Sequence, residues 1–136
     1  MSVFDTIAIA GSGLTAQRLR MDVASGNIAN AESTRTAGGG PYRPESVVFT
    51  AQPVSPNADA PGVAAVQIVT PNTGPVRVYD PSHPDADAQG FVSYPDVDVA
   101  TQIADLMGAA RSYSLNSTVA QAAKQQALDA LELGRG

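Results

Sequence analysis

Hydrophobic residues recur every seven positions along the first thirty residues. The large members of this repeat are Ile7, Leu14, Met21 and Ile28. The alternate positions are mostly small: Val3, Ala10, Ala24 and Ala31, with Gln17 as a polar exception. This spacing is typical of a helix that packs along a narrow stripe. It predicts an axial helix over residues 1–31, which needs a packing partner because its glycines weaken it.

A similar spacing of three and four residues returns near the C-terminus. The stripe comprises Val99, Ile103, Leu106, Ala110, Tyr113, Ser117, Ala120, Ala127 and Leu131, with Lys124 breaking the row. Asp96 and Asp98 are suitable N-terminal caps, and Gly134 is a suitable stop. The pattern predicts a second axial helix within residues 97–136, about 50–55 Å long at 1.5 Å per residue.

The middle segment, residues 32–96, has a different pattern and holds all 10 prolines. The runs YRPESVVF, AVQIV and PVRVY resemble short strands, while GGGP and TPNTGP are turn signals. Residues 50–62 are predicted to form an exposed loop. The whole chain is therefore predicted to be α+β. Long terminal helices form a coiled-coil-like pair or assembly core, and a small β-hairpin lies in an irregular middle segment.

The two helical stripes are narrow and rich in small residues, and the middle segment is too small to cover them. An amphipathic helix draws most of its stability from packing rather than from intrinsic propensity. The apolar stripes are therefore expected to pack against other copies of the chain or other proteins. The sequence predicts an assembly subunit whose two ends enter a helical layer built from several chains.

Three polar residues near these stripes have two interpretations each, and one aromatic residue has a single interpretation. Asn27 and Asn30 either accompany the fraying end of the first helix or form a polar pair that fixes register within a helical interface. Arg111 is either solvated or paired with an acid of another chain. Tyr113 can bury its ring in the stripe while its hydroxyl finds a partner.

Composition narrows the range of partners. The formal net charge is -5 and aromatic residues make up 5% of the chain, which argues against nucleic-acid binding. The chain has no cysteine, so disulfides and thiolate metal sites are excluded. It has no apolar run near twenty residues, and Asp5 interrupts the apolar N-terminus. We therefore expect neither a membrane span nor a cleaved secretory signal.

The run DADAQGFVSYPD raises the question of a calcium loop. Asp85, Asp87, Gln89 and Gly90, with Asp96 in the twelfth place, approximate the required spacing. Gln89, however, replaces an acid or Asn, Asp96 is shorter than Glu, and prolines precede and interrupt the run. The sequence favours a turn-rich connector to the last helix, with a small calcium-binding interaction module as the alternative.

The chain shows no pattern that indicates catalysis. His83 is its single histidine and lies between residues typical of turns. It could bind a metal weakly with Asp80 and Asp85 or belong to a hydrolytic triad, but no nucleophile elbow or phosphate-binding loop accompanies it. We predict no enzymatic activity, no catalytic or metal-binding residue and no cofactor.

Two long segments carry a family resemblance. GSGLTAQRLRMDVASGNIANAEST resembles the N-terminal segment of bacterial flagellar rod and hook proteins, and YRPESVVF fits the next segment of that family. VYDPSHPDADAQGFVSYPDVDV and AARSYSLNSTVAQAAKQQALDALELG resemble the C-terminal half of a proximal-rod member. The resemblance covers residues 3–50 and 76–134. It departs at YPDV, where Met-Pro-Asn-Val is expected, and at AARSYSLN, where Ala-Ser-Arg-x-Tyr-Glu-Ala-Asn is usual.

The resemblance implies a structural role in bacterial motility. Such a chain would be a subunit of the proximal rod of the flagellar basal body, assembled through its terminal helices into a hollow drive shaft. It would leave the cell through the flagellar type III export apparatus without a cleaved signal and reach the periplasm. Its partners would be other copies of itself and the rod proteins FlgB, FlgF, FlgG and FliE. The alternative within this class is another rod component such as FlgB.

The predicted assembly interface draws on both helices. In the first helix its members are Ile7, Leu14, Met21, Asn27, Ile28 and Asn30. In the second helix they are Val99, Ile103, Leu106, Ala110, Arg111, Tyr113, Ala120 and Leu131.

Overall fold

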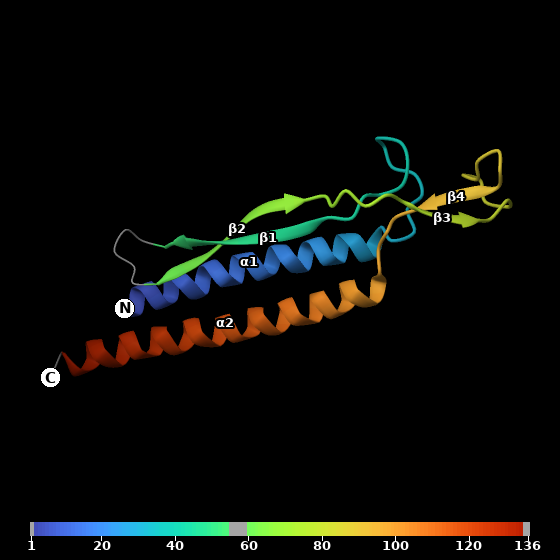
Figure 1. Ribbon diagram of the computed structural model, residues 1–136. Helices are drawn as coiled ribbons and strands as arrows, with labels where there is room; N and C mark the ends of the chain where they lie inside the picture. Colours follow the sequence, from blue (N-terminus) through green and yellow to red (C-terminus); the bar gives the residue numbers. More distant parts are fainter. Residues whose placement is uncertain (1, 55–59, 135–136) are drawn as a thin grey trace.

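The computed structural model describes residues 2–54 and 60–134. Its elements, in order, are α1 (Val3–Ala29), β1 (Ser46–Pro53), β2 (Pro61–Val69), β3 (Val76–Tyr79), β4 (Phe91–Tyr94) and α2 (Val99–Leu133). The two helices run antiparallel, side by side, with the β1–β2 hairpin along α1 and the β3–β4 hairpin beyond the C-terminal end of α1 (Figure 1). The predicted α+β fold with long terminal helices is confirmed.

Local capping signals fix where α1 begins and ends. The Ser2 hydroxyl accepts from the Phe4 amide at 3.2 Å, and the Asp5 carboxylate accepts from the Ser2 amide at 2.9 Å. This reciprocal capping box satisfies amides that have no partner within the helix. At the other end the Asn30 amide donates to the Gly26 carbonyl at 3.1 Å, and the helix ends at Ala29.

Asp98 is the N-cap of α2. Its carboxylate accepts from the Ala100 amide at 3.1 Å and from the Thr101 hydroxyl at 2.5 Å, and the Thr101 bond lowers the pKa of Asp98. The helix continues for 35 residues, or about 52 Å, to the C-cap Gly134. The expected length is confirmed, and of the two predicted caps Asp98 is the one that the structure assigns.

The strands form two separate antiparallel pairs. In β1–β2, Ser46 pairs with Val69 and Pro53 with Pro61, with an irregularity between Val48 and Phe49. The predicted loop over 50–62 is therefore too wide, because regular backbone pairing extends the hairpin at both edges. Residues 55–59 of that loop lie outside the described residues.

The second hairpin contains a strand that the sequence did not reveal. In β3–β4, Val76 pairs with Tyr94 and Tyr79 with Phe91. The β4 strand is only 4 residues long and lies inside the run interpreted as a connector. Its pairing with β3 defines it more than its own composition does.

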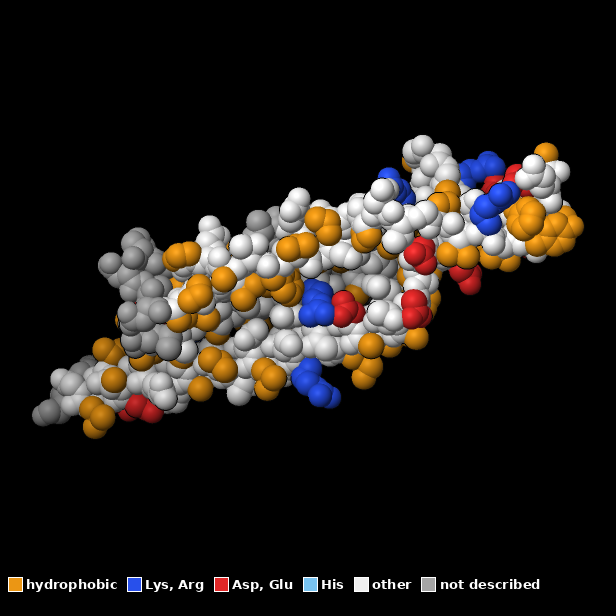
Figure 2. Space-filling model, viewed as in Figure 1, with side chains coloured by type: hydrophobic (Ala, Val, Ile, Leu, Met, Phe, Trp, Pro, Cys, Tyr) orange, Lys and Arg blue, Asp and Glu red, His pale blue; other side chains and the backbone are white. Residues whose placement is uncertain are grey.

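The buried core of the described residues is thin and made of small side chains. Its hydrophobic members are Ala10, Ala16, Ala24, Val92, Ala109 and Ala123. Many larger hydrophobic side chains remain exposed, and Figure 2 shows them spread over both the helices and the β-hairpins. Much of the bulky apolar surface is therefore not used to hold this single chain together.

Candidate functional site

Small residues line the seam between α1 and α2. Ala16 and Ala109 have no exposed surface, and Ala24 retains 2%. A Cβ atom added at Gly13 would lie 2.7 Å from Nδ2 of Asn116, closer than normal contact. The glycine therefore lets the two helices approach closely at this point.

Asn27 lies at the base of the helix pair, which is the end where α1 finishes and α2 begins. It is 1% exposed, and its Nδ2 donates to the Glu45 carbonyl at 2.8 Å and to Oε1 of Gln102 at 2.9 Å. Its Oδ1 accepts from the Tyr42 hydroxyl at 3.0 Å and from the Glu45 amide at 2.9 Å. Burial raises the pKa of Tyr42, and Glu45 adds to that shift. One side chain thus joins α1, α2 and the segment that leads into β1.

Two further polar contacts complete the base. The side chain of Asn30 donates to the Gly26 carbonyl at 2.9 Å and accepts from the Ser33 hydroxyl at 3.2 Å, so Asn30 ends its own helix. Arg20 forms an ion pair with Asp105 across the seam, including an Nε to Oδ2 distance of 3.3 Å. Asn27 and Asn30 therefore have different roles within the chain.

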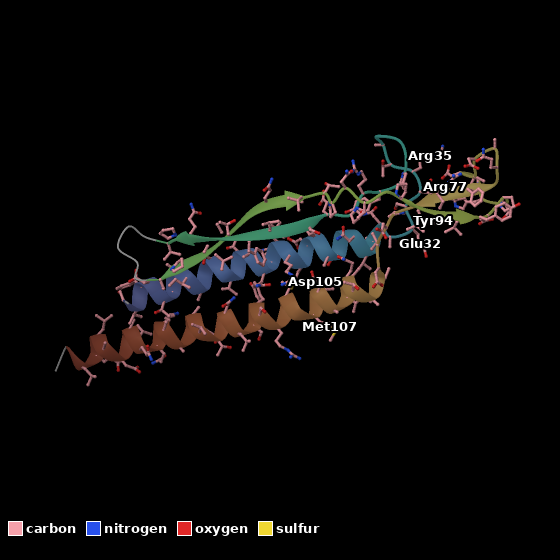
Figure 3. All side chains as sticks on the ribbon, in the orientation of Figure 1. Glu32, Arg35, Arg77, Tyr94, Asp105 and Met107 are labelled. Atoms are coloured by element: carbon pink, nitrogen blue, oxygen red, sulfur yellow. The ribbon has the colours of Figure 1, made fainter. Side chains whose placement is uncertain are left out.

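The seam uses a face of α2 next to the predicted stripe. Gln102, Ala109, Asn116 and Ala123 recur every seven residues, and each is buried or partly buried. Asp105 points from α2 toward α1, whereas Met107 points away from it (Figure 3). The stripe predicted from hydrophobicity lies beside this face. The prediction missed the seam itself because its residues are small or polar and give no hydrophobic signal.

The predicted interface residues of α2 remain largely uncovered in the single chain. Val99 is 39% exposed, Ile103 46%, Tyr113 37% and Leu131 65%. The remaining members divide between exposed and half-buried positions: Ala110 and Arg111 are exposed, while Leu106 and Ala120 are half-buried. The apolar stripe thus presents a continuous flank beside the seam.

The large residues of the α1 repeat flank the same seam. Ile7, Leu14, Met21 and Ile28 are all half-buried. The small line of that repeat supplies the buried positions instead, with Ala10 and Ala24 at 4% and 2% exposure. Small residues form the contact between the two helices, and the larger residues lie outside that contact.

The acids of the calcium-like run bind other groups of the same chain. The Asp85 carboxylate accepts from the Thr34 hydroxyl at 2.8 Å and pairs with Arg35. Asp87 accepts from the Phe91 amide at 2.9 Å and pairs with Arg77. The Thr34 bond and the Phe91 bond lower the pKa of Asp85 and of Asp87, respectively. These acids tie the β3–β4 hairpin to itself and to residues 34–35.

His83 belongs to the same turn. Its Nδ1 accepts from the Asp85 amide at 3.0 Å, and its ring lies edge-on to Tyr94 with centroids 6.1 Å apart. Asp80 instead accepts from the hydroxyl and the amide of Ser82, which lowers the pKa of Asp80. The histidine therefore stabilises a turn through its backbone contact.

Two general properties concern the part of the chain that the structure describes. Over residues 2–54 and 60–134, no three His, Cys, Asp or Glu side chains gather in a way that could hold a metal ion. Neither helix within these ranges is both long and apolar enough to cross a bilayer.

Comparison with protein families places both ends of the chain in one class. Residues 7–35 match the family model described as flagella basal body rod protein. Residues 88–133 match the model described as flagellar basal body rod FlgEFG protein C-terminal. These matches cover most of α1 and all of α2, and they define a structural protein of the flagellar rod.

Full-length relatives narrow the class further. The chain is 39% identical to the flagellar basal-body rod protein FlgC of Escherichia coli O157:H7, over 99% of this chain and 100% of the relative. It is 36% identical to the FlgC protein of Borreliella burgdorferi over 100% of both chains, and 35% identical to that of Bacillus subtilis over 99% of this chain and 100% of the relative. The chain belongs to the FlgC family of flagellar basal-body rod proteins.

Membership assigns a structural role and a place in the cell. The chain is a structural component of the flagellar basal body and is not an enzyme. Its family implies assembly with other rod components. The uncovered flanks of α1 and α2 are therefore the candidate functional surfaces, rather than a pocket or a cluster of acids.

Proposed function

We propose that the chain assembles through its terminal helices into the proximal part of the hollow flagellar drive shaft. The observation that carries this proposal is the separation of small and large residues around the helix pair. Small residues such as Ala109 close the seam, while bulky residues such as Ile103 and Leu131 stay uncovered. Burial of that apolar flank against neighbouring chains would supply the free energy of assembly.

The interface consists of the residues that flank the seam. On α1 these are Ile7, Leu14, Met21 and Ile28, and on α2 they are Val99, Ile103, Leu106, Ala110, Tyr113, Ala120 and Leu131. Asn27 and Asn30 hold the base in the shape that presents this flank. The partners are other copies of the chain and the rod proteins FlgB, FlgF, FlgG and FliE.

Export and assembly are linked in this proposal. The chain passes through the flagellar type III export apparatus without a cleaved signal and completes its helix packing at the rod in the periplasm. The seam buries small residues, so the pair gains little apolar contact per turn before assembly. Ordering each residue costs about 1–2 kcal/mol, and burial against neighbouring chains offsets that cost.

A charge placed on the flank tests the proposal. Ile103→Asp should abolish swimming and remove the chain from purified basal bodies, while its cellular level stays normal. Gln67→Asp adds the same charge at an exposed position of β2, outside the helix flanks, and should leave both unchanged. Normal basal bodies in the Ile103→Asp strain would refute the interface.

Hydrogen exchange tests the link between ordering and assembly. In the purified chain, amides of residues 3–23 and 106–133 should exchange faster than those in the base around Asn27 and Gln102, whose hydrogen bonds hold the two helices together. The same helical amides should be protected in isolated basal bodies. Slow exchange along both helices of a monomer would overturn the idea that packing is completed at the rod.

A further inference from the structure

The face of α2 turned away from α1 carries one cation and one anion on the same line. Arg111 and Asp129 are eighteen positions apart in the sequence, which is five turns at 3.6 residues per turn, or about 27 Å along the helix axis. Both side chains are exposed. Asp129 accepts from Nε2 of Gln125 at 2.8 Å, which holds it on this face. Within residues 2–54 and 60–134, Arg111 has no ion-pair partner.

Apolar side chains accompany the two charges. Met107 is 66% exposed, Leu115 62% and Leu133 85%. Ala104, Met107, Gly108 and Arg111 line a shallow hollow on this face. At Gly108 an added Cβ would meet nothing within 4 Å, so another helix can approach here.

We infer that this face binds the same face of a second copy of the chain. In that arrangement the two α2 helices run in the same direction and are staggered by five turns. Asp129 of one copy then pairs with Arg111 of the next. The inference rests on the proposed function, because it names one contact by which copies of a rod subunit assemble.

The same stagger also brings other residues of the two helices level with one another. A shift of eighteen positions brings Ala122 of one copy level with Ala104 of the next, and Leu133 level with Leu115. Small residues allow close approach near the middle of the contact, and the leucines bury apolar surface at its end. The same shift places the C-terminal half of one α2 against the N-terminal half of the next.

The projecting end of α2 makes this overlap accessible. Gly13 faces Asn116 and Asn27 bonds to Gln102, so Val3 at the start of α1 lies near the level of residue 126. The last turns of α2 therefore extend beyond α1, as Figure 1 shows. A neighbouring copy can cover this end without displacing α1.

The two α2 helices could run parallel or antiparallel, and the assembly that each arrangement would build decides between them. An antiparallel pair would also bring Arg111 to Asp129, but it would close into a dimer with both faces used. A head-to-tail contact leaves one free face at each end and can continue along an assembly. A shaft requires a contact of the continuing kind.

Cysteine pairs distinguish the two directions, and the absence of native cysteine gives a clean background. In basal bodies carrying only an Ala104→Cys/Ala122→Cys chain, a short thiol cross-linker should give covalent dimers and higher oligomers. A Thr118→Cys chain and an Ala122→Cys chain made together in one cell are the control for an antiparallel pair, and both should remain monomeric. Cross-linking of the control pair, or of neither pair in chains that have entered basal bodies, would overturn the inference.

Charge reversal tests the ion pair without cysteines. Arg111→Asp and Asp129→Arg should each reduce the amount of chain in basal bodies several-fold, and the double variant that exchanges the charges should restore it. Equal loss in the single and double variants would refute the pair. This outcome is separable from failure of the proposed function, which would appear as normal basal bodies in the Ile103→Asp strain.

Discussion

Nδ2 of Asn27 lies 2.9 Å from Oε1 of Gln102, and this bond joins α1 to α2 where the two helices begin to run together. Asn27 also binds both backbone groups of Glu45 and the Tyr42 hydroxyl. All of its polar atoms are therefore satisfied although the residue is buried. The position of the β1–β2 hairpin and that of α2 depend on the same side chain.

Removing this side chain should weaken the whole base. Asn27→Ala leaves buried partners without bonds and should lower the free energy of unfolding by about 2–4 kcal/mol, measured by urea denaturation followed by circular dichroism. Asn30→Ala, which mainly affects a helix end, should cost about 1 kcal/mol or less. In a double-mutant cycle with Gln102→Ala, purely additive effects would contradict the bond across the seam.

Two glycines of α1 provide a matched test of close packing. An added Cβ at Gly11 meets nothing within 4 Å, whereas one at Gly13 lies 2.7 Å from Asn116. Gly11→Ala should therefore stabilise the chain by about 1 kcal/mol through helix propensity, and Gly13→Ala should lose that gain. Combining Gly13→Ala with Asn116→Ala should recover part of it in thermal unfolding. Equal gains at the two glycines would show that the helices do not approach closely here.

The two long terminal helices could be predicted because their signals are local. Caps such as Ser2 and Asp98 and the repeat of large residues all lie within the segment that they define. The face of α2 that meets α1 could not be predicted from local signals. Ala109 and Asn116 carry no strong hydrophobic signal, and a buried seam of small residues becomes visible only when the partner helix is placed.

The middle segment was harder to predict for a different reason. The four-residue strand β4 exists through pairing with β3, and the acids of its preceding turn suggested calcium ligands by spacing alone. In the structure Thr34 and Arg35, far away in the sequence, satisfy Asp85. Spacing within a segment could not reveal those partners.

The β3–β4 turn depends on a left-handed glycine. Gly90 has φ of 83°, and an added Cβ would lie 2.9 Å from the Tyr79 ring and 3.2 Å from Pro81. Gly90→Ala should destabilise the hairpin by about 2 kcal/mol or more, because contact adds to backbone strain. Gly39 has φ of 81° with open space around it, so Gly39→Ala should cost only the strain, about 1 kcal/mol. Similar losses of stability for both variants would argue against the Tyr79 contact.

Acid should loosen the same hairpin. The pKa of Asp87 is lowered chiefly by the Phe91 amide, and that of Asp85 chiefly by the Thr34 hydroxyl. A carboxyl group with a lowered folded-state pKa contributes its full stability above the ordinary aspartate pKa of about 3.9. That contribution is lost as the pH falls below this value and through the lower folded pKa.

Amide hydrogen exchange, expressed as protection factors, measures this loss of stability. The Gln89 and Phe91 amides, which both donate to Asp87, should keep their protection from pH 7 to about pH 4.5 and lose it at lower pH. Asp87→Asn retains an acceptor oxygen but lacks the charge that pairs with Arg77, so its protection at pH 7 should be lower and should vary less in acid. Asp22→Asn, at an exposed position of α1, should behave like the unaltered chain. Protection of these two amides that persists unchanged to pH 2.5 would show that the Asp87 carboxylate does not hold the turn.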